Sequence, residues 1–216
     1  PRPNVAPIIS QKERVLMASV VQYYFAPQSP WTYLGHLRLW DVARKHGARI
    51  EVLPVDLGGK VFPVSGGLPL GKRAPQRQAY RLVEMKRFSE ALHAPLNLQP
   101  KYFPVAGDDA ARLIIAVALN DGADAAMHIT DAVLRAVWVQ ERNIADEATL
   151  AALLAERELP ARRIEDAHSQ AVAERYEHNT QRAIDAGVFG APSYVIDGEI
   201  FWGQDRLDFV DRRLQR

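Results

Sequence analysis

The stretch that best predicts the fold of this chain is GVFGAPSYVIDGEIFWGQDRL, residues 187–207. A run of β-branched and aromatic residues follows Ala191-Pro192, and Asp197-Gly198 is a typical two-residue hairpin turn. Residues 199–202 therefore return as a second strand. Asp205 follows at a position where it can cap a short helix. This stretch predicts a strand, a tight turn, a second strand and a helix.

A second informative region lies near the N-terminus. Residues 20–25 form an apolar and aromatic run that predicts a strand, and the run leads into Ser29-Pro30, a typical helix start. Apolar residues then recur with a helical period, which predicts a helix over residues 30–46 that ends at Gly47. Residues 49–55 are rich in β-branched side chains and predict another strand. With the C-terminal hairpin, this order of elements is typical of a thioredoxin-like fold.

The middle of the chain, residues 68–186, has a helical pattern. Three prolines interrupt it once, which predicts an extended crossing between helices at residues 96–105. Asp121 or Asp146 can cap helices in this part. One helix is expected to bury an amphipathic face made of Tyr80, Leu82, Val83, Met85, Phe88 and Leu92.

These elements predict an α/β protein with a thioredoxin-like fold and a large inserted all-helical domain. Residues 17–67 and 187–216 are assigned to the thioredoxin-like domain, and residues 68–186 to the helical insertion. Residues 1–16 are interpreted as an extension or a cloning remnant, with Met17 as a plausible native start.

Composition narrows the range of partners. The chain has 216 residues, and its 27 basic residues nearly cancel its 26 acidic ones, so the net charge implies neither nucleic acid nor an anionic membrane as a partner. No apolar run approaches the length of a membrane span. We therefore expect a cytoplasmic protein.

The chain contains no cysteine. Dithiol exchange requires a thiolate supplied by the protein, so a thioredoxin-like fold without cysteine cannot perform it. Any sulfur chemistry must use a borrowed thiol, and glutathione is the obvious candidate in the cytosol.

The residues at the two ends also carry a family resemblance. Ser29-Pro-Trp-Thr32 stands where a thioredoxin relative has Cys-x-x-Cys, and the C-terminal motif continues as GVFGAPSYVIDGEIFWGQDRLDF. Together they resemble the glutathione-dependent 2-hydroxychromene-2-carboxylate isomerase family, which is similar to kappa-class glutathione transferases and to DsbA-type disulfide oxidoreductases. The resemblance covers about residues 19–216 and is strongest at both ends.

The resemblance makes Ser29 the expected catalytic residue. A thiolate at a helix N-terminus meets unpaired backbone N–H groups and the positive end of the helix dipole, and a serine hydroxyl can donate one more hydrogen bond to it. The alternative is that Ser29 is only a helix cap, which Ser-Pro alone would favour.

The resemblance also implies a glutathione site. Thioredoxin-like folds place a cis-proline before their hairpin, here Pro192, so that the preceding backbone can pair with an extended thiol peptide. Asp205 offers a carboxylate for the γ-glutamyl ammonium, and the N–H groups of Asp205 and Arg206 suit the carboxylate of glutathione. The alternatives are an edge-strand proline and a simple cap and turn. The expected glutathione-binding residues are Ser29, Ala191, Pro192, Trp202, Gly203, Gln204, Asp205 and Arg206.

The family's reaction opens a cyclic hemiketal carboxylate reversibly to an aryl-substituted unsaturated ketoacid. Many relatives carry Lys and Asn near the substrate in a Phe-Lys-x-Thr-Gly-Asn segment, where this chain has Pro63 and Gly67. Lys60, Lys72, Arg73 and Arg77 are candidates to replace the cation from a neighbouring position, and the alternative for each is an exposed, solvated charge. The substrate pocket is predicted to include Trp31, Pro54, Lys60, Phe62 and Tyr80.

Two other functions stay open, a kappa-like glutathione transferase and a non-catalytic protein that binds glutathione or a peptide. The changed substrate loop favours both of these over what the C-terminal motif alone suggests. A homodimer is also left open. The six histidines show no metal-binding spacing, and His36 is interpreted as a helix-packing residue.

Overall fold

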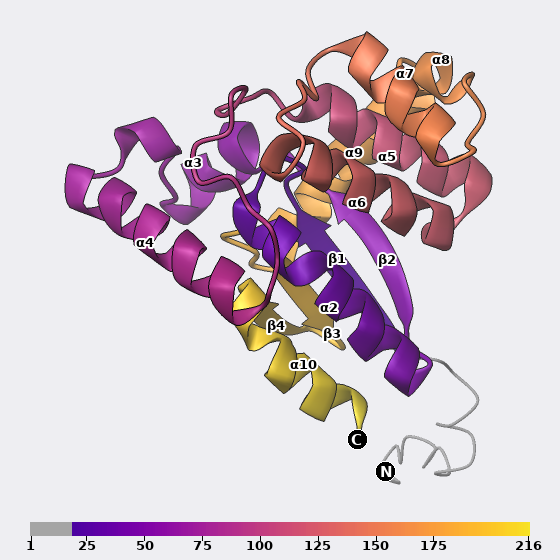
Figure 1. The fold of residues 1–216 in the computed structure, drawn as a ribbon. Coiled ribbons are helices and arrows are strands. Elements are labelled where there is room, and N and C mark those ends of the chain that lie inside the picture. Colours follow the sequence, from indigo (N-terminus) through magenta and orange to yellow (C-terminus); the bar gives the residue numbers. More distant parts are fainter. Residues whose placement is uncertain (1–18) are drawn as a thin grey trace, which may run out of the picture.

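The computed structural model describes residues 19–216, and a mixed four-stranded sheet lies at its centre (Figure 1). The strands are β1 (Val20–Phe25), β2 (Arg49–Pro54), β3 (Ser193–Ile196) and β4 (Glu199–Trp202), in the order β2-β1-β3-β4. β1 is parallel to β2 and antiparallel to β3, and β3 is antiparallel to β4. The four strands lie where the sequence predicts them along the chain.

Local chemistry explains where α2 (Pro30–His46) begins and ends. The Ser29 side chain caps it, and Pro30 supplies a fixed helical φ at a position whose N–H would have no partner in the helix. Gly47 ends it with φ 62°, a left-handed conformation that favours glycine, and its N–H donates to the Arg44 carbonyl. The predicted bounds of this helix are confirmed.

Most helices lie between β2 and β3 in the sequence. They are α3 (Phe62–Ser65), α4 (Pro75–Ala91), α5 (Asp108–Asp121), α6 (Ala123–Trp138), α7 (Glu147–Glu156), α8 (Arg163–Ala167) and α9 (Gln170–Asp185), and α10 (Leu207–Leu214) follows the sheet. A π-helical turn (Leu57–Val61) links β2 to α3. The predicted interruption of the helices at residues 96–105 is confirmed, but the stretch is not extended throughout, since the Phe103 amide closes a turn on the Pro100 carbonyl at 3.1 Å. None of the helices in residues 19–216 is long and apolar enough to cross a membrane.

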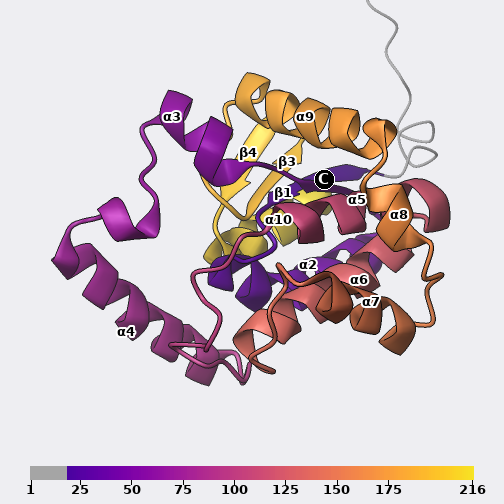
Figure 2. The same cartoon turned by 90° about the horizontal axis from the view of Figure 1, so that it is seen from above.

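Both faces of the sheet are covered (Figure 2). Tyr23 and Phe25 of β1 belong to the larger core, which α2, α5 and α6 complete. Tyr24, between them, belongs to a smaller core with Val195 of β3 and Ala183 of α9, because successive side chains of a strand point to opposite faces. The thioredoxin-like fold with helical additions is therefore confirmed. The division into residues 17–67 with 187–216 and residues 68–186 stays a prediction, and residues 1–18 lie outside the described part.

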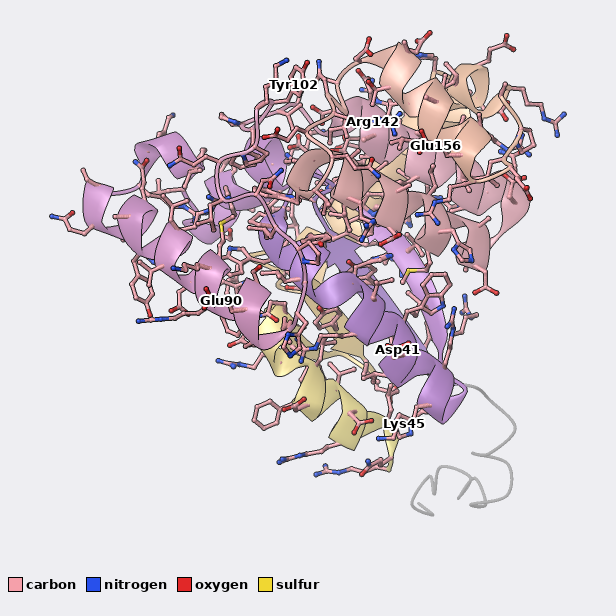
Figure 3. All side chains as sticks on the ribbon, in the orientation of Figure 1. Asp41, Lys45, Glu90, Tyr102, Arg142 and Glu156 are labelled. Carbon is pink, nitrogen blue, oxygen red and sulfur yellow. The ribbon has the colours of Figure 1, made fainter. Side chains whose placement is uncertain are left out.

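Charged side chains cover the outside of the molecule, as Figure 3 shows. Many of them pair, such as Arg142 with Glu156 at 2.8 Å and Lys45 with Asp211 at 2.8 Å. This pairing agrees with the nearly balanced composition.

Three local predictions need a comment. Asp146 caps α7 as expected, accepting from the Thr149 amide at 3.0 Å. The alternative cap Asp121 was wrong: Gly122 precedes α6, and Asp121 instead binds the buried Arg163 at 2.6 Å. The amphipathic face of α4 was also partly wrong, since Tyr80 is 57% exposed. It lies on the outer side of the helix, as does Val83.

Candidate functional site

One end of the sheet brings the two informative sequence regions together. Phe25, the last residue of β1, pairs with Pro54, while Tyr24 pairs with Ser193 and Ser193 pairs with Trp202. The loop before α2, the Pro192 loop and the turn after β4 therefore start from this same end. Segments far apart in sequence meet here because of the strand order, as the sequence predicts.

Ser29 lies at the N-terminus of α2 and is half-buried. Its Oγ accepts from the Thr32 amide at 3.3 Å, which leaves the hydroxyl hydrogen free to donate elsewhere. Tyr33 donates its amide to the Ser29 carbonyl at 3.1 Å. The Trp31 amide has no hydrogen-bond partner within residues 19–216. A free hydroxyl donor and a free amide donor therefore stand together at the positive end of the helix.

The Ala191-Pro192 peptide bond is cis, as the resemblance implies. Pro192 accepts from the Gly203 amide at 2.9 Å, so the loop is fixed to the end of β4. Ser193 Oγ donates to the Gly190 carbonyl at 2.8 Å and fixes it from the other side. In the described part of the chain, the backbone N–H and C=O of Ala191 make no hydrogen bond. Both groups can therefore pair with an extended peptide.

The turn after β4 differs from the prediction in two ways. Asp205 does not cap a helix; a 3-10 turn (Gln204–Arg206) precedes α10, and Gly203 with φ 111° stands before it. The Asp205 carboxylate binds Arg206 at 2.7 Å instead. The Arg206 amide donates to the Gly203 carbonyl at 3.1 Å, so it is not free for a ligand. Glutathione binding by the Asp205 carboxylate and amide stays a prediction.

Gln204 and Trp202 occupy very different surroundings. Gln204 is buried, and its two oxygens accept from Arg38 at 2.9 and 3.0 Å. Its side chain therefore ties α2 to the turn rather than facing a ligand. Trp202 is 51% exposed and meets Phe189 edge-on, with ring centroids 4.7 Å apart. These two rings form an open aromatic surface beside the Pro192 loop.

The predicted pocket residues are only partly brought together. Trp31 meets Phe88 of α4 edge-on, with ring centroids 6.3 Å apart. Lys60 pairs with Glu177 of α9, and Tyr80 lies on the outer face of α4, so these two do not join Trp31. Pro54 ends β2, and its carbonyl accepts from the Asn179 side chain at 3.4 Å.

Pro63 and Gly67, which stand where relatives carry Lys and Asn, provide no polar side chain. Pro63 is exposed, and the Phe62 ring lies against Gly67 so closely that no side chain fits at residue 67 without displacing it. The positions where relatives carry Lys and Asn therefore hold neither a charge nor an amide side chain here.

His36 packs inside the core, as predicted. It is 1% exposed, its Nε2 lies 3.0 Å from the Met127 carbonyl, and its Nδ1 lies 3.2 Å from the Tyr23 hydroxyl. Because a carbonyl only accepts, Nε2 carries the proton and Nδ1 accepts from Tyr23. Burial lowers the pKa of His36 to about 4, so the ring is neutral at pH 7. No group of metal-binding side chains occurs within residues 19–216.

Sequence reasoning missed Arg81. Its guanidinium carbon lies 5.0 Å from the Phe103 ring centroid and 5.7 Å from that of Trp138. Arg81 Nη2 and Trp138 Nε1 are both buried without a hydrogen-bond partner in the described part of the chain. The available signal was the helical spacing of Arg81, Met85 and Phe88, which places all three on one face of α4.

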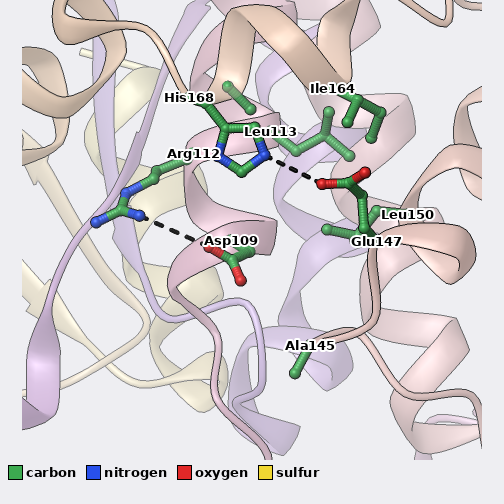
Figure 4. A pocket seen from close by; sticks show the side chains of 9 residues that line it. Asp109, Arg112, Leu113, Ala145, Glu147, Leu150, Ile164 and His168 are labelled. Atoms are coloured by element: carbon green, nitrogen blue, oxygen red, sulfur yellow. Dashed lines mark hydrogen bonds and ion pairs between the residues drawn. The ribbon is translucent and has the colours of Figure 1, made fainter.

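A small cavity lies elsewhere, between α5, α7 and α8 (Figure 4). Two pairs line it, Arg112 with Asp109 at 3.6 Å and His168 with Glu147 at 3.2 Å. None of its lining residues belongs to the predicted site. The candidate site is therefore the end of the sheet and the facing side of α4.

Comparison with known proteins identifies the family of the chain. The sequence profile of the DSBA-like thioredoxin domain matches residues 20–215, and the chain belongs to that family. The chain is 28% identical over 199 residues to 2-hydroxychromene-2-carboxylate isomerase of Sphingobium xenophagum, covering 92% of this chain and 99% of that one. It is also 28% identical over 200 residues to the isomerase of the same name from Pseudomonas putida, covering 91% and 95%.

Solved structures agree. A structure of 2-hydroxychromene-2-carboxylate isomerase aligns with a TM-score of 0.77 and 25% identity, covering 91% of this chain and 95% of that one. The resemblance stated from the sequence is therefore confirmed, and the named relatives are isomerases.

Proposed function

We propose that this chain is a glutathione-dependent isomerase that acts on an aromatic-degradation intermediate, as a relative of 2-hydroxychromene-2-carboxylate isomerase. The observation that carries the proposal is the start of α2, where the Ser29 hydroxyl and the Trp31 amide are free donors in a chain without cysteine. A borrowed thiol is the group that this arrangement suits. The cytosol, which holds reduced glutathione, is the compartment that the proposal implies.

The residues at the end of the sheet fit glutathione. Ala191 offers a free N–H and C=O for the cysteinyl backbone, and the Asp205 carboxylate suits the γ-glutamyl ammonium. A solved structure of the cytosolic disulfide reductase DsbM from Pseudomonas aeruginosa with GSH has this fold, with a TM-score of 0.64 and 17% identity over 91% of this chain and all of that one. This supports the fold as one that accommodates the tripeptide.

The roles of the protein groups follow from these positions. Glutathione, when bound, supplies a nucleophilic thiolate that adds reversibly to a conjugated double bond, so that the resulting single bond can rotate. Ser29 donates its free O–H toward the sulfur and the Trp31 amide adds a second donor, which together favour the anion over the thiol. Ala191 and Asp205 hold the tripeptide in one orientation. In an isomerisation the thiol would be released again, so glutathione would not be consumed.

A kappa-like glutathione transferase is the second candidate, and the Pro63 and Gly67 positions favour it. With no charge or amide there, the loop does not reproduce the substrate contacts of the relatives. A transferase would consume one glutathione for each turnover, whereas an isomerase would return it. Counting free thiols during the reaction therefore separates the two.

The test is calorimetric titration with glutathione, followed by incubation with an aryl-substituted unsaturated 2-oxo acid. We expect binding at millimolar glutathione or below, and isomerisation that depends on glutathione without loss of free thiol. Absence of glutathione binding at millimolar concentration would exclude the proposal. Binding without any change in the 2-oxo acid would favour a non-catalytic relative.

A further inference from the structure

The inner face of α4 looks toward the start of α2. Arg81, Met85 and Phe88 share this face; Met85 is fully buried, and Phe88 meets Trp31 edge-on. Trp31 stands two residues after Ser29 and is the second residue of α2. Arg81 therefore shares this face of α4 with Phe88 and lies about two turns before it.

Arg81 sits on an aromatic platform formed by Phe103 and Trp138. One guanidinium nitrogen, Nη2, is buried there without an acceptor in the described part of the chain. Stacking on aromatic faces is a favourable setting for arginine, yet it does not satisfy the N–H donors. A half-buried guanidinium whose donors lack a carboxylate has more to gain from binding an anion than one in water.

The surroundings of Arg81 contain no available counter-charge. The neighbouring charges are Arg73 and Arg77, and neither forms an ion pair within residues 19–216. Glu84, one turn along α4, is already bound to Arg87 at 2.7 Å. Burial, with Arg73 as a smaller cause, lowers the pKa of Arg81 to about 10, which leaves it charged at pH 7. An anionic ligand would relieve this accumulation of positive charge.

We propose that Arg81 binds the carboxylate of an aromatic, unsaturated acid whose apolar part packs beside Trp31 and Phe88. The inference rests on the proposed function, since it places the substrate of that reaction next to the start of α2. Relatives carry a lysine where this chain has Pro63. The proposal assigns the corresponding positive charge to Arg81 of α4, instead of to a residue of the π-helical turn or α3. Lys60 is not assigned this role, because its ammonium pairs with Glu177 of α9 rather than lying on the α4 face that carries Arg81.

The experiment compares Arg81→Met with Lys86→Met, which removes a positive charge from an exposed position on the same helix. The probes are trans-cinnamate and trans-cinnamamide, which share the aryl and alkene groups and differ in charge. Binding of each probe and of glutathione is measured separately by calorimetry. The glutathione titration tests the proposed function, and failure of the wild type to bind glutathione would count against that function. The cinnamate titration is independent of it and tests the role of Arg81.

We expect the wild type to prefer cinnamate over cinnamamide, and Arg81→Met to lose about tenfold or more of its cinnamate affinity, which is what one charge-assisted pair contributes. Cinnamamide and glutathione affinities should not change, and Lys86→Met should match the wild type. Arg81→Lys keeps the charge but lacks the planar guanidinium, so its cinnamate affinity should lie between those of the wild type and Arg81→Met. It replaces Arg81→Met as the test if that variant does not fold. Equal affinity of the wild type for both probes, or an unchanged cinnamate affinity in Arg81→Met or Arg81→Lys, overturns the proposal.

Discussion

Replacing Ser29 with alanine tests whether this side chain stabilises a thiolate or only caps a helix. The chain provides a matched control, because Ser169 caps α9 with the same geometry. In both caps the serine Oγ accepts from the amide three residues on at 3.3 Å, and both serines are half-buried. Ser169 does not belong to the predicted site. Ser29→Ala and Ser169→Ala therefore remove the same cap at two places.

The two variants should lose similar stability and differ in thiol chemistry. Loss of one serine cap costs about 1 kcal/mol in the free energy of unfolding. Ser29→Ala should also remove one hydrogen bond to the sulfur anion, about 1.5 to 3 kcal/mol. At 1.36 kcal/mol for each pKa unit, the pKa of bound glutathione should rise by about one to two units. Ser29→Cys can retain activity, because it restores a side chain that donates to or replaces the thiol.

The measurements are urea unfolding and an ultraviolet titration of the thiolate in the glutathione complex. Both variants should unfold at lower urea than the wild type, and Ser29→Ala alone should shift the thiolate titration to higher pH and lower turnover. Identical thiolate titrations for the wild type and Ser29→Ala would refute the role of Ser29 and leave it as a cap.

Three more predictions follow from the contacts described above. Asp205→Asn should weaken glutathione binding several-fold, about 1 kcal/mol at low salt and less as salt is added, because one charge is removed from a partly exposed site. Asp197→Asn, at the exposed hairpin tip, is the control. Equal glutathione affinities of Asp205→Asn and the wild type would contradict the assignment of Asp205 to the γ-glutamyl ammonium. The pKa of His36 is about 4 in the folded protein, against 6.5 for an unperturbed histidine. The free energy of unfolding should therefore keep its full value above pH 6.5 and fall by about 3 kcal/mol as the pH drops to about 4. Urea unfolding between pH 6.5 and 4 should show a steeper loss of the free energy of unfolding in the wild type than in His36→Asn. The same pH dependence in both proteins would contradict this prediction. Lys60→Met should leave turnover unchanged, since Glu177 holds Lys60; a loss of turnover would return Lys60 to the substrate pocket.

Much of the sheet and of α2 is predictable because the signals are local. Ser29 and Pro30 start the helix and Gly47 ends it through their own backbone preferences. Asp197-Gly198 makes the hairpin turn because both residues tolerate positive φ, 49° and 82° here. These features need no knowledge of the rest of the chain.

The errors occur where a distant contact decides. Asp205 is a good cap residue, yet Arg38 binds the Gln204 carbonyl and side chain, and the chain makes a 3-10 turn at this point instead. On α4, sequence favoured burial of Tyr80 over Arg81, because tyrosine is the more apolar of the two. Phe103 and Trp138, which come from other segments, provide the surface that covers Arg81, and helical periodicity carries no information about them.

The Arg38–Gln204 contact joins positions 166 residues apart and binds α2 to the turn after β4. Both partners lie in the segments that flank the helical insertion, so this contact joins the two segments without any side chain from residues 75–105. Under the proposed function, the glutathione contacts of Ala191 and Asp205 and the substrate contact of Arg81 come from separate stretches of the chain. Changes in α4 and the crossing after it would then alter the choice of acceptor while the contacts to the thiol persist, and the Arg81 contact proposed above would be a change of this kind.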